Sequence, residues 1–304
     1  MVFEYIFEFW WMLPVAFCIC LIATSSSVEG AVFFTPIFIL VFPLVAGVRI
    51  VPIEAIFLAL SIELFGFGSA MIGYLRRRLV DLSIVGKVLP VSVPVGMGFG
   101  LLAHRVPSHL ILGFLGGLMI ILSALMLYSY LAGGFHEAAV EGEGPPTRID
   151  SLGRSYLYTY EHGLIGVSWS SLGGILVGLT GIGIGELTTT TLILRNKLPV
   201  RVAVGTGIMI VFFTAFMATL VHAYVFSSGE LNVHWNILFM TIPAVACGGQ
   251  ISPYINSRMD GEKMKAFLSL IFIVVGGLLI WRGLGGGRGM KYTSGFVERP
   301  SSLC

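Results

Sequence analysis

Two short runs of small and polar residues interrupt the apolar segments of this chain. The first run, residues 25–30, contains three serines, Glu29 and Gly30. The second run, residues 180–185, alternates glycine with other residues and leads into Glu186 and four threonines. Irregular backbone persists inside a bilayer only where protein or a water-filled cavity surrounds it, because hydrocarbon offers no hydrogen-bond partner. We call these runs the first break and the second break, and we expect a binding site there.

The chemistry that the two breaks could support is the binding of an anion. A helix that starts at mid-depth presents free N–H groups and the positive end of its dipole, and glycine lets a ligand approach the backbone closely. Nearby hydroxyl groups could donate further hydrogen bonds, although each could instead bond only to its own helix. The expected substrate-binding residues are Ser25, Ser26, Ser27, Gly30, Thr180, Gly181, Gly183, Gly185, Thr188 and Thr206.

Ionisable side chains inside apolar segments are candidates for coupling the anion to a proton. An ionised group at the bilayer centre costs at least about 2.5 kcal/mol, so such residues are usually functional or paired. Burial favours the neutral form of a carboxyl group, which could then carry a proton beside the anion. The candidates are Glu29, Glu63, Glu186 and His222. For the histidine, a hydrogen bond to a neighbouring helix is the more common role.

Composition indicates a membrane protein. Of 304 residues, 56% are hydrophobic and 11% are charged, with a mean hydropathy of +0.92; soluble domains carry about 25% charged residues. The net charge of +2 and the lack of basic runs interleaved with aromatics argue against a nucleic-acid partner. The expected partners are a small anionic substrate, a coupling ion and the lipid bilayer, with a homodimer as a further candidate. The expected location is the plasma (inner) membrane, crossed several times.

Motifs for catalysis or metal binding are missing from the sequence. The four cysteines form no CxxC pair, and no histidine stands at metal-ligand spacing. The sequence contains no Gly-x-Ser-x-Gly, His-Glu-x-x-His or Walker motif. We therefore expect no metal, no cofactor and no enzymatic activity.

The apolar segments divide the chain into two halves. Eight regions are long enough to matter for a bilayer, and the polar stretch 133–161 separates four from four. The predicted fold is all-α, a polytopic membrane protein of two pseudo-symmetric four-region repeats, each opening with a broken or re-entrant helix. The predicted divisions are a first repeat (1–132), a polar linker (133–161), a second repeat (162–282) and a flexible C-terminal tail (283–304).

A weak internal repeat relates the two breaks. A shift of 155 residues aligns Gly30 with Gly185 and Thr35 with Thr190, and paired interrupted segments point to a transporter site near the membrane midplane. If both broken segments re-enter, Lys and Arg divide twelve against six between the two sides. That imbalance favours re-entrant, inverted halves with the linker on the cytoplasmic side; two crossing segments would give ten against eight.

The chain resembles the TauE/SafE family, the sulfite exporter or sulfonate-uptake permease group, from about Cys20 to Arg282. The resemblance rests on a glycine-rich break followed by a helix, a proline and an Ala-x-Gly-Thr element, and on an aromatic-glycine run before a basic turn. The matching residues are Gly181–Gly185, Pro199–Thr206, Phe65–Ser69 and Tyr74–Asp81. This resemblance implies a carrier of small sulfur-containing or related organic anions, driven by an ion gradient, with two repeats around a central site.

The first half departs from the family pattern. Ser26–Gly30 stands where the family usually has consecutive glycines, and Ile53–Ala55 replaces the Gly-Thr element of the second half. Either the second half binds the anion while the first supplies protonatable groups, or the substrate is not a simple anion. The leading hypothesis is an H⁺-coupled secondary transporter that works by alternating access. An anion channel and an intramembrane enzyme or sensor are the alternatives.

Overall fold

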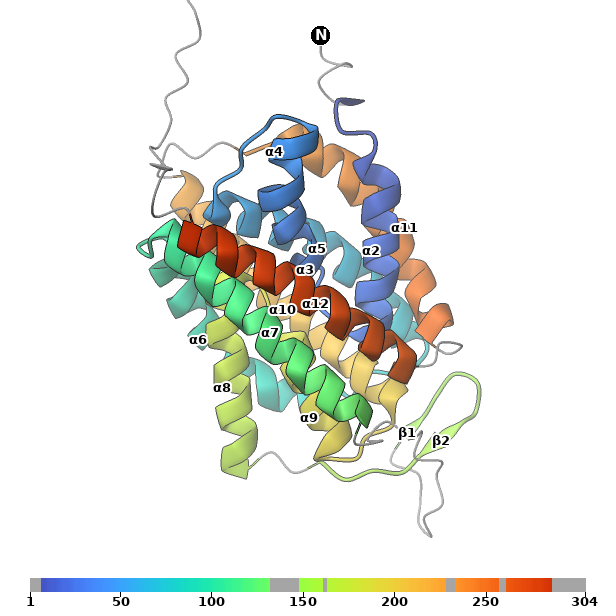
Figure 1. Ribbon diagram of the computed structural model, residues 1–304. Helices are drawn as coiled ribbons and strands as arrows, with labels where there is room; N and C mark the ends of the chain where they lie inside the picture. Colours follow the sequence, from blue (N-terminus) through green and yellow to red (C-terminus); the bar gives the residue numbers. More distant parts are fainter. Residues whose placement is uncertain (1–6, 132–147, 161–162, 228–232, 257–260, 286–304) are drawn as a thin grey trace, which may run out of the picture.

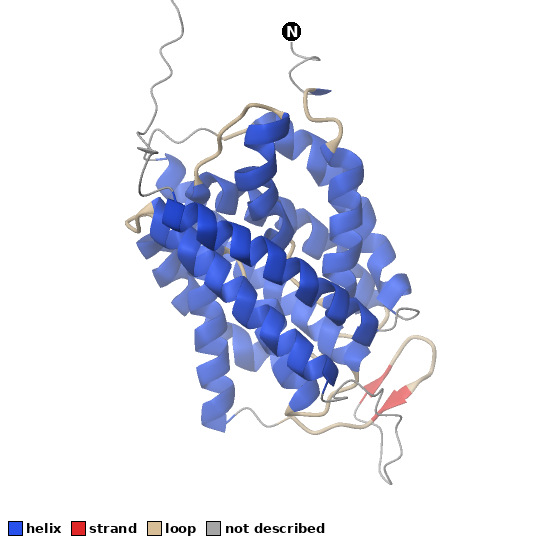
Figure 2. Cartoon of the chain, viewed as in Figure 1, coloured by secondary structure: helices blue, strands red, loops and turns tan. Residues whose placement is uncertain are grey.

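The computed structural model describes residues 7–131, 148–160, 163–227, 233–256 and 261–285 (Figure 1). This part of the chain is helical apart from loops and one pair of two-residue strands (Figure 2). Seven of the described helices are long and apolar enough to cross a membrane, which confirms an all-α, multi-pass integral membrane protein. The elements are α2 (Met12–Ser26), α3 (Ala31–Pro36), the π-helical turn η1 (Ile37–Val41), α4 (Phe42–Val45), α5 (Pro52–Arg76), α6 (Leu82–Ala103), α7 (Ser108–Leu131), β1 (Arg148–Ile149), β2 (Ser155–Tyr156), α8 (Gly163–Thr180), α9 (Ile184–Leu194), α10 (Val200–Ser227), α11 (Trp235–Asn256) and α12 (Gly261–Gly285).

Each broken segment folds back on itself as a helical hairpin. The ring of Trp11, at the start of α2, lies 5.4 Å from the ring of Phe42 at the start of α4. In the second half, Gly166 near the start of α8 and Arg195 after the end of α9 line one small cavity. The second arm of each hairpin therefore returns to the region where the first arm begins. Figure 1 shows α4 at one end of the molecule and α9 at the other, so the hairpins enter from opposite ends.

The long helices pack against one another through small residues. A Cβ added to Gly116 of α7 would lie 2.6 Å from the carbonyl oxygen of Gly276 in α12. Figure 1 shows these two helices side by side along one face of the molecule. Small residues permit this close approach of backbones, which is the usual basis of helix association in a membrane.

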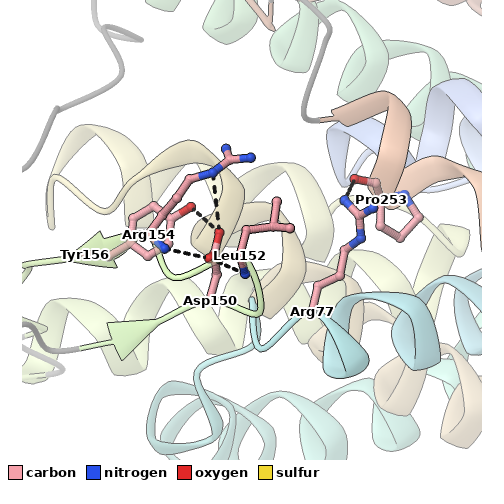
Figure 3. Close-up of polar contacts among 6 residues, drawn as sticks. All are labelled: Arg77, Asp150, Leu152, Arg154, Tyr156 and Pro253. Carbon is pink, nitrogen blue, oxygen red and sulfur yellow. Dashed lines mark hydrogen bonds and ion pairs between the residues drawn. The ribbon is translucent and has the colours of Figure 1, made fainter.

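The described part of the polar linker forms a β-hairpin at the α9 end of the molecule (Figure 2). Asp150 holds its turn by accepting hydrogen bonds from the N–H groups of Leu152 and Arg154 and from the hydroxyl of Tyr156 (Figure 3). Short local hydrogen bonds from an Asp side chain are a common device in turns. The sequence analysis expected only a polar connection here.

The linker hairpin is fastened to the turn between α5 and α6. The N–H of Ser151 donates to the carbonyl of Arg77 at 3.1 Å, and the hydroxyl of Tyr158 donates to the carboxylate of Asp81 at 2.7 Å. Arg77 in turn donates to the carbonyl of Pro253 in α11 (Figure 3). Residues 133–147 and 161 of the predicted linker and 286–304 of the predicted tail lie outside the described residues, while α12 continues to Gly285.

Candidate functional site

The two breaks meet at the tips of the two hairpins. The carboxylate of Glu29, in the first break, accepts hydrogen bonds from three successive N–H groups at the start of α9: Gly183 at 2.6 Å, Ile184 at 2.8 Å and Gly185 at 3.0 Å. The first N–H groups of a helix have no partner within the helix and carry the positive end of its dipole. The N-terminus of α9 therefore binds a carboxylate in the protein interior, and that carboxylate belongs to the chain itself.

Glycine is required in the second break for two separate reasons. Gly181 and Gly183 have φ angles of +75° and +120°, a region that residues with a side chain rarely adopt. Gly185 is required for space, because a Cβ there would lie 2.5 Å from the carbonyl oxygen of Ser27. The glycines thus shape the turn that frees the N–H groups and let the two breaks touch.

Two further carboxyl groups hold the first break. Glu63, on α5, accepts the N–H of Ala31 at 3.2 Å, and Glu186, on α9, accepts the N–H of Glu29 at 3.2 Å. Each break therefore receives a carboxyl group from another part of the chain. The side chains are almost fully buried, with 1% of Glu29, 2% of Glu63 and 4% of Glu186 exposed.

The three carboxyl groups of Glu29, Glu63 and Glu186 lie together without a positively charged partner among the described residues. Among the described residues, none of the three carboxyl groups forms an ion pair; the ion pair found there joins Asp150 to Arg154 in the linker. The Oε1 of Glu186 accepts the main-chain N–H of Glu29, and its Oε2 is buried without a hydrogen-bond partner. Ionised carboxylates buried close together repel each other strongly at low dielectric, so the cluster is suited to holding a proton.

Two hydroxyl groups next to the breaks have no hydrogen-bond partner. The Oγ of Ser27 and the Oγ1 of Thr189 are buried and unpaired, and each lies 2.5 Å from the position that a Cβ of Gly207 would occupy. One small group could therefore contact both. Ser27 was predicted from the sequence, whereas Thr189 and Gly207 were not. A local signal exists for Thr189, since it stands three residues after Glu186 and so shares its face of α9.

Three other hydroxyls named from the sequence bond to their own helices. Ser25 and Ser26 donate to the carbonyl of Ile22 at 3.1 and 2.8 Å, and Thr180 donates to that of Leu176 at 2.8 Å. This is the alternative that the sequence analysis kept open, because Ser and Thr commonly bond back to the preceding turn. Their role in binding stays a prediction.

Three more of the named residues lie away from the Glu29 carboxylate contact. The hydroxyl of Thr206 accepts the N–H of Asp81, in the α5–α6 connection, at 2.9 Å. Thr188 is half-buried and lines the small cavity between α8 and α9. Gly30 precedes α3, and a Cβ added there would lie 3.5 Å from the ring of Phe34 and 4.0 Å from the Cβ of Glu63. The structure therefore brings Ser27, Glu29 and the second-break glycines together, but not all the predicted binding residues.

His222 does not join the three carboxyl groups. Its Nδ1 lies 2.8 Å from Nε2 of His104, at the end of α6. Fifteen residues of α10 separate His222 from Gly207, which corresponds to about 22 Å along a helix. His104 was not predicted, since nothing in the local sequence pairs it with a residue on a distant helix.

A separate cavity of about 490 Å³ reaches the end of α8. It is lined mainly by apolar side chains at the α6–α7 connection and the end of α12, and it touches Leu179 and Thr180. Its polar lining includes His109. Among the described residues, no group of three or more His, Cys, Asp or Glu side chains could hold a metal ion.

Comparison with known proteins shows a family. The family model described as sulfite exporter TauE/SafE matches residues 12–279. The chain is 29% identical over 135 residues to the probable membrane transporter protein YunE of Bacillus subtilis (strain 168), and this match covers 44% of the chain and 47% of that protein, about half of its length. No solved structure matches. The chain therefore belongs to the sulfite exporter TauE/SafE family, which is a family of transporters and not of enzymes, and it is a multi-pass membrane protein.

Proposed function

We propose that this transporter carries small sulfur-containing anions, such as sulfite, a sulfonate or a related organic anion, across the inner membrane together with H⁺. The observation that carries the proposal is the contact between the Glu29 carboxylate and three N–H groups of α9. A site that holds one carboxylate in the protein interior has the hydrogen bonds and the partial positive charge that a small oxyanion needs.

The packing of the helices supports alternating access between two related halves. On one side α11 packs against α5 and α2, and on the other α6 packs against α10 and α8. These contacts correspond if α2, α5 and α6 are matched with α8, α10 and α11. Opposed hairpins with broken helices at the centre are the arrangement in which inverted repeats rock around a fixed site.

The carboxyl cluster supports H⁺ as the coupling ion. Glu29, Glu63 and Glu186 are buried together with no ion-pair partner among the described residues. In membrane proteins, buried acids in such clusters commonly take part in proton transfer. Ser27 and Thr189 supply free hydroxyl groups beside them, which could bond to further oxygens of the anion.

The test is accumulation in proteoliposomes that contain the purified full-length protein. Sulfite, thiosulfate, methanesulfonate and acetate would be offered with an inward proton gradient. We expect at least one sulfur anion to accumulate above its external concentration, and a protonophore to abolish the accumulation. Downhill flux alone, with unitary currents in planar bilayers, would indicate an anion channel and contradict the proposal. Transport of none of the four anions would contradict the proposal as well.

A further inference from the structure

We propose that Glu29 is an exchangeable internal anion: its ionised carboxylate occupies the place of the transported anion at the start of α9, and its protonation vacates that place. This inference rests on the proposed function, because it assigns to the same site the event that couples the two ions. Each anion would then enter with one proton, which is held on Glu29 while the anion is bound.

The geometry distinguishes Glu29 from the other two acids. Its carboxylate accepts three N–H groups at 2.6 to 3.0 Å, all from the first turn of α9. Glu63 and Glu186 accept main-chain N–H groups of this region at the longer distance of 3.2 Å, from Ala31 and Glu29 respectively. A carboxylate on three N–H groups at a helix N-terminus has the bonding that a bound oxyanion would have. The carboxylate of Glu29 reaches these N–H groups from the other hairpin, at the end of a flexible side chain.

Charge explains why the Glu29 carboxylate and the transported anion would not occupy the start of α9 at the same time. A helix N-terminus carries about half a positive charge, which suits one anion but not two. Hydrogen bonds to an ionised acceptor are roughly twice as strong as those to a neutral one, so protonated Glu29 holds the N–H groups weakly. An incoming monovalent anion restores the strong bonds. The site gains one proton and one negative charge, and its net charge does not change.

The neighbours of Glu29 favour this cycle. The titratable side chains that interact with it are Glu186 of α9 and Glu63 of α5, and neither has an ion-pair partner among the described residues. A second negative charge entering beside them without a proton would be costly in a buried site. The unpaired hydroxyls of Ser27 and Thr189 can accept or donate a hydrogen bond, and can therefore bond to the displaced carboxylic acid or to the anion.

The experiment measures binding of methanesulfonate to the full-length protein in detergent between about pH 5 and about pH 8, a range over which this probe keeps one negative charge. For the wild type, affinity should fall as pH rises, by up to about tenfold per pH unit. In Glu29→Gln the competing charge is absent, so binding should remain at alkaline pH and vary less than about twofold over the range. In proteoliposomes the same variant should lose accumulation driven by the proton gradient while downhill flux continues.

Glu54→Gln is the matched control. Glu54 is a buried carboxyl at another helix N-terminus, where it accepts the N–H of Val51 at 3.4 Å, and its loss should leave the pH dependence of binding intact. Glu29→Asp is a second variant that keeps the charge but shortens the side chain, so its carboxylate competes less well. It should bind the probe at higher pH than the wild type and still titrate.

The outcomes separate the inference from the proposed function. If the wild type binds methanesulfonate in a pH-dependent way and Glu29→Gln shows the same dependence, the inference is overturned and the proposed function stands. A folded Glu29→Gln that binds no probe at any pH overturns it too, because the carboxylate would then be required for binding. If the wild type binds no anion among sulfite, thiosulfate, methanesulfonate and acetate, both fail.

Discussion

The two breaks meet in the protein interior, yet they present opposite chemistry. The second break offers three converging N–H groups, which Gly181 and Gly183 free by adopting positive φ angles. The first break offers a carboxylate, Glu29, and its own N-terminal N–H groups are met by Glu63 and Glu186. One hairpin therefore supplies donors and the other supplies the acceptor. The difference shows that two broken segments of a chain can be complementary partners rather than two copies of one site.

Crowding at the tips gives the largest expected effect. Ala at Gly185 would place a Cβ 2.5 Å from the Ser27 carbonyl and 2.9 Å from Val211, so the breaks would have to move apart. We expect Gly185→Ala to lower the free energy of unfolding by about 3 kcal/mol and to abolish transport. Thermal unfolding in detergent and uptake by proteoliposomes would measure both.

A glycine of the first break is the control for that substitution. Gly30 has a φ of −62°, and the nearest atoms to an added Cβ are 3.5 Å away. Gly30→Ala should therefore leave stability unchanged or raise it by up to about 1 kcal/mol. Equal losses in the two variants would show that the close approach of the breaks is not specific to Gly185.

Two threonines of the second half should respond differently to the same change. Thr206→Val leaves the half-buried N–H of Asp81 without its acceptor, which should cost about 1 kcal/mol of stability. Thr189→Val removes a hydroxyl that has no partner, so stability should hold while the affinity for the anion falls. Unfolding and binding of methanesulfonate, measured on both variants, would check this; a Thr189→Val protein with unchanged affinity would remove Thr189 from the proposed site.

The smallest expected effect is a change of stability with pH, caused by two tyrosines that follow the β-hairpin of the linker. Burial, with the Asp81 contact, raises the pKa of Tyr158 above its ordinary value, and burial raises the pKa of Tyr160 to about 12. Both phenols stay neutral in the folded protein at a pH where the unfolded chain ionises, above about 10. The stability that they contribute is therefore complete below about pH 10 and is lost as pH rises above it.

Tyr158→Phe tests that assignment. The variant loses the hydrogen bond to Asp81 and should be less stable at neutral pH by about 1 kcal/mol. Its unfolding midpoint should then fall less steeply than that of the wild type between about pH 9 and about pH 11. A parallel fall in both proteins would place the alkaline sensitivity elsewhere in the chain.

Much of the fold was predictable because its causes are local. Hydropathy located the apolar helices, and the small polar residues at 25–30 and 180–185 marked the two breaks. Burial of Glu29, Glu63 and Glu186 followed from their places in or beside apolar runs. The hairpin of the linker was missed, since it depends on the turn at Asp150 and on contacts with Arg77 and Asp81 rather than on alternating hydrophobic residues.

By itself, the sequence determined that this chain is a membrane protein of the TauE/SafE type with two interrupted segments and buried acids, because hydropathy and local residue types are written along the chain. Only the tertiary structure decided which acid meets which helix. Glu29 lies 154 residues from Gly183, and no local pattern encodes a pairing over that distance. The packing of two opposed hairpins brings the carboxylate of one onto the free N–H groups of the other, since each would otherwise leave buried polar groups unpaired.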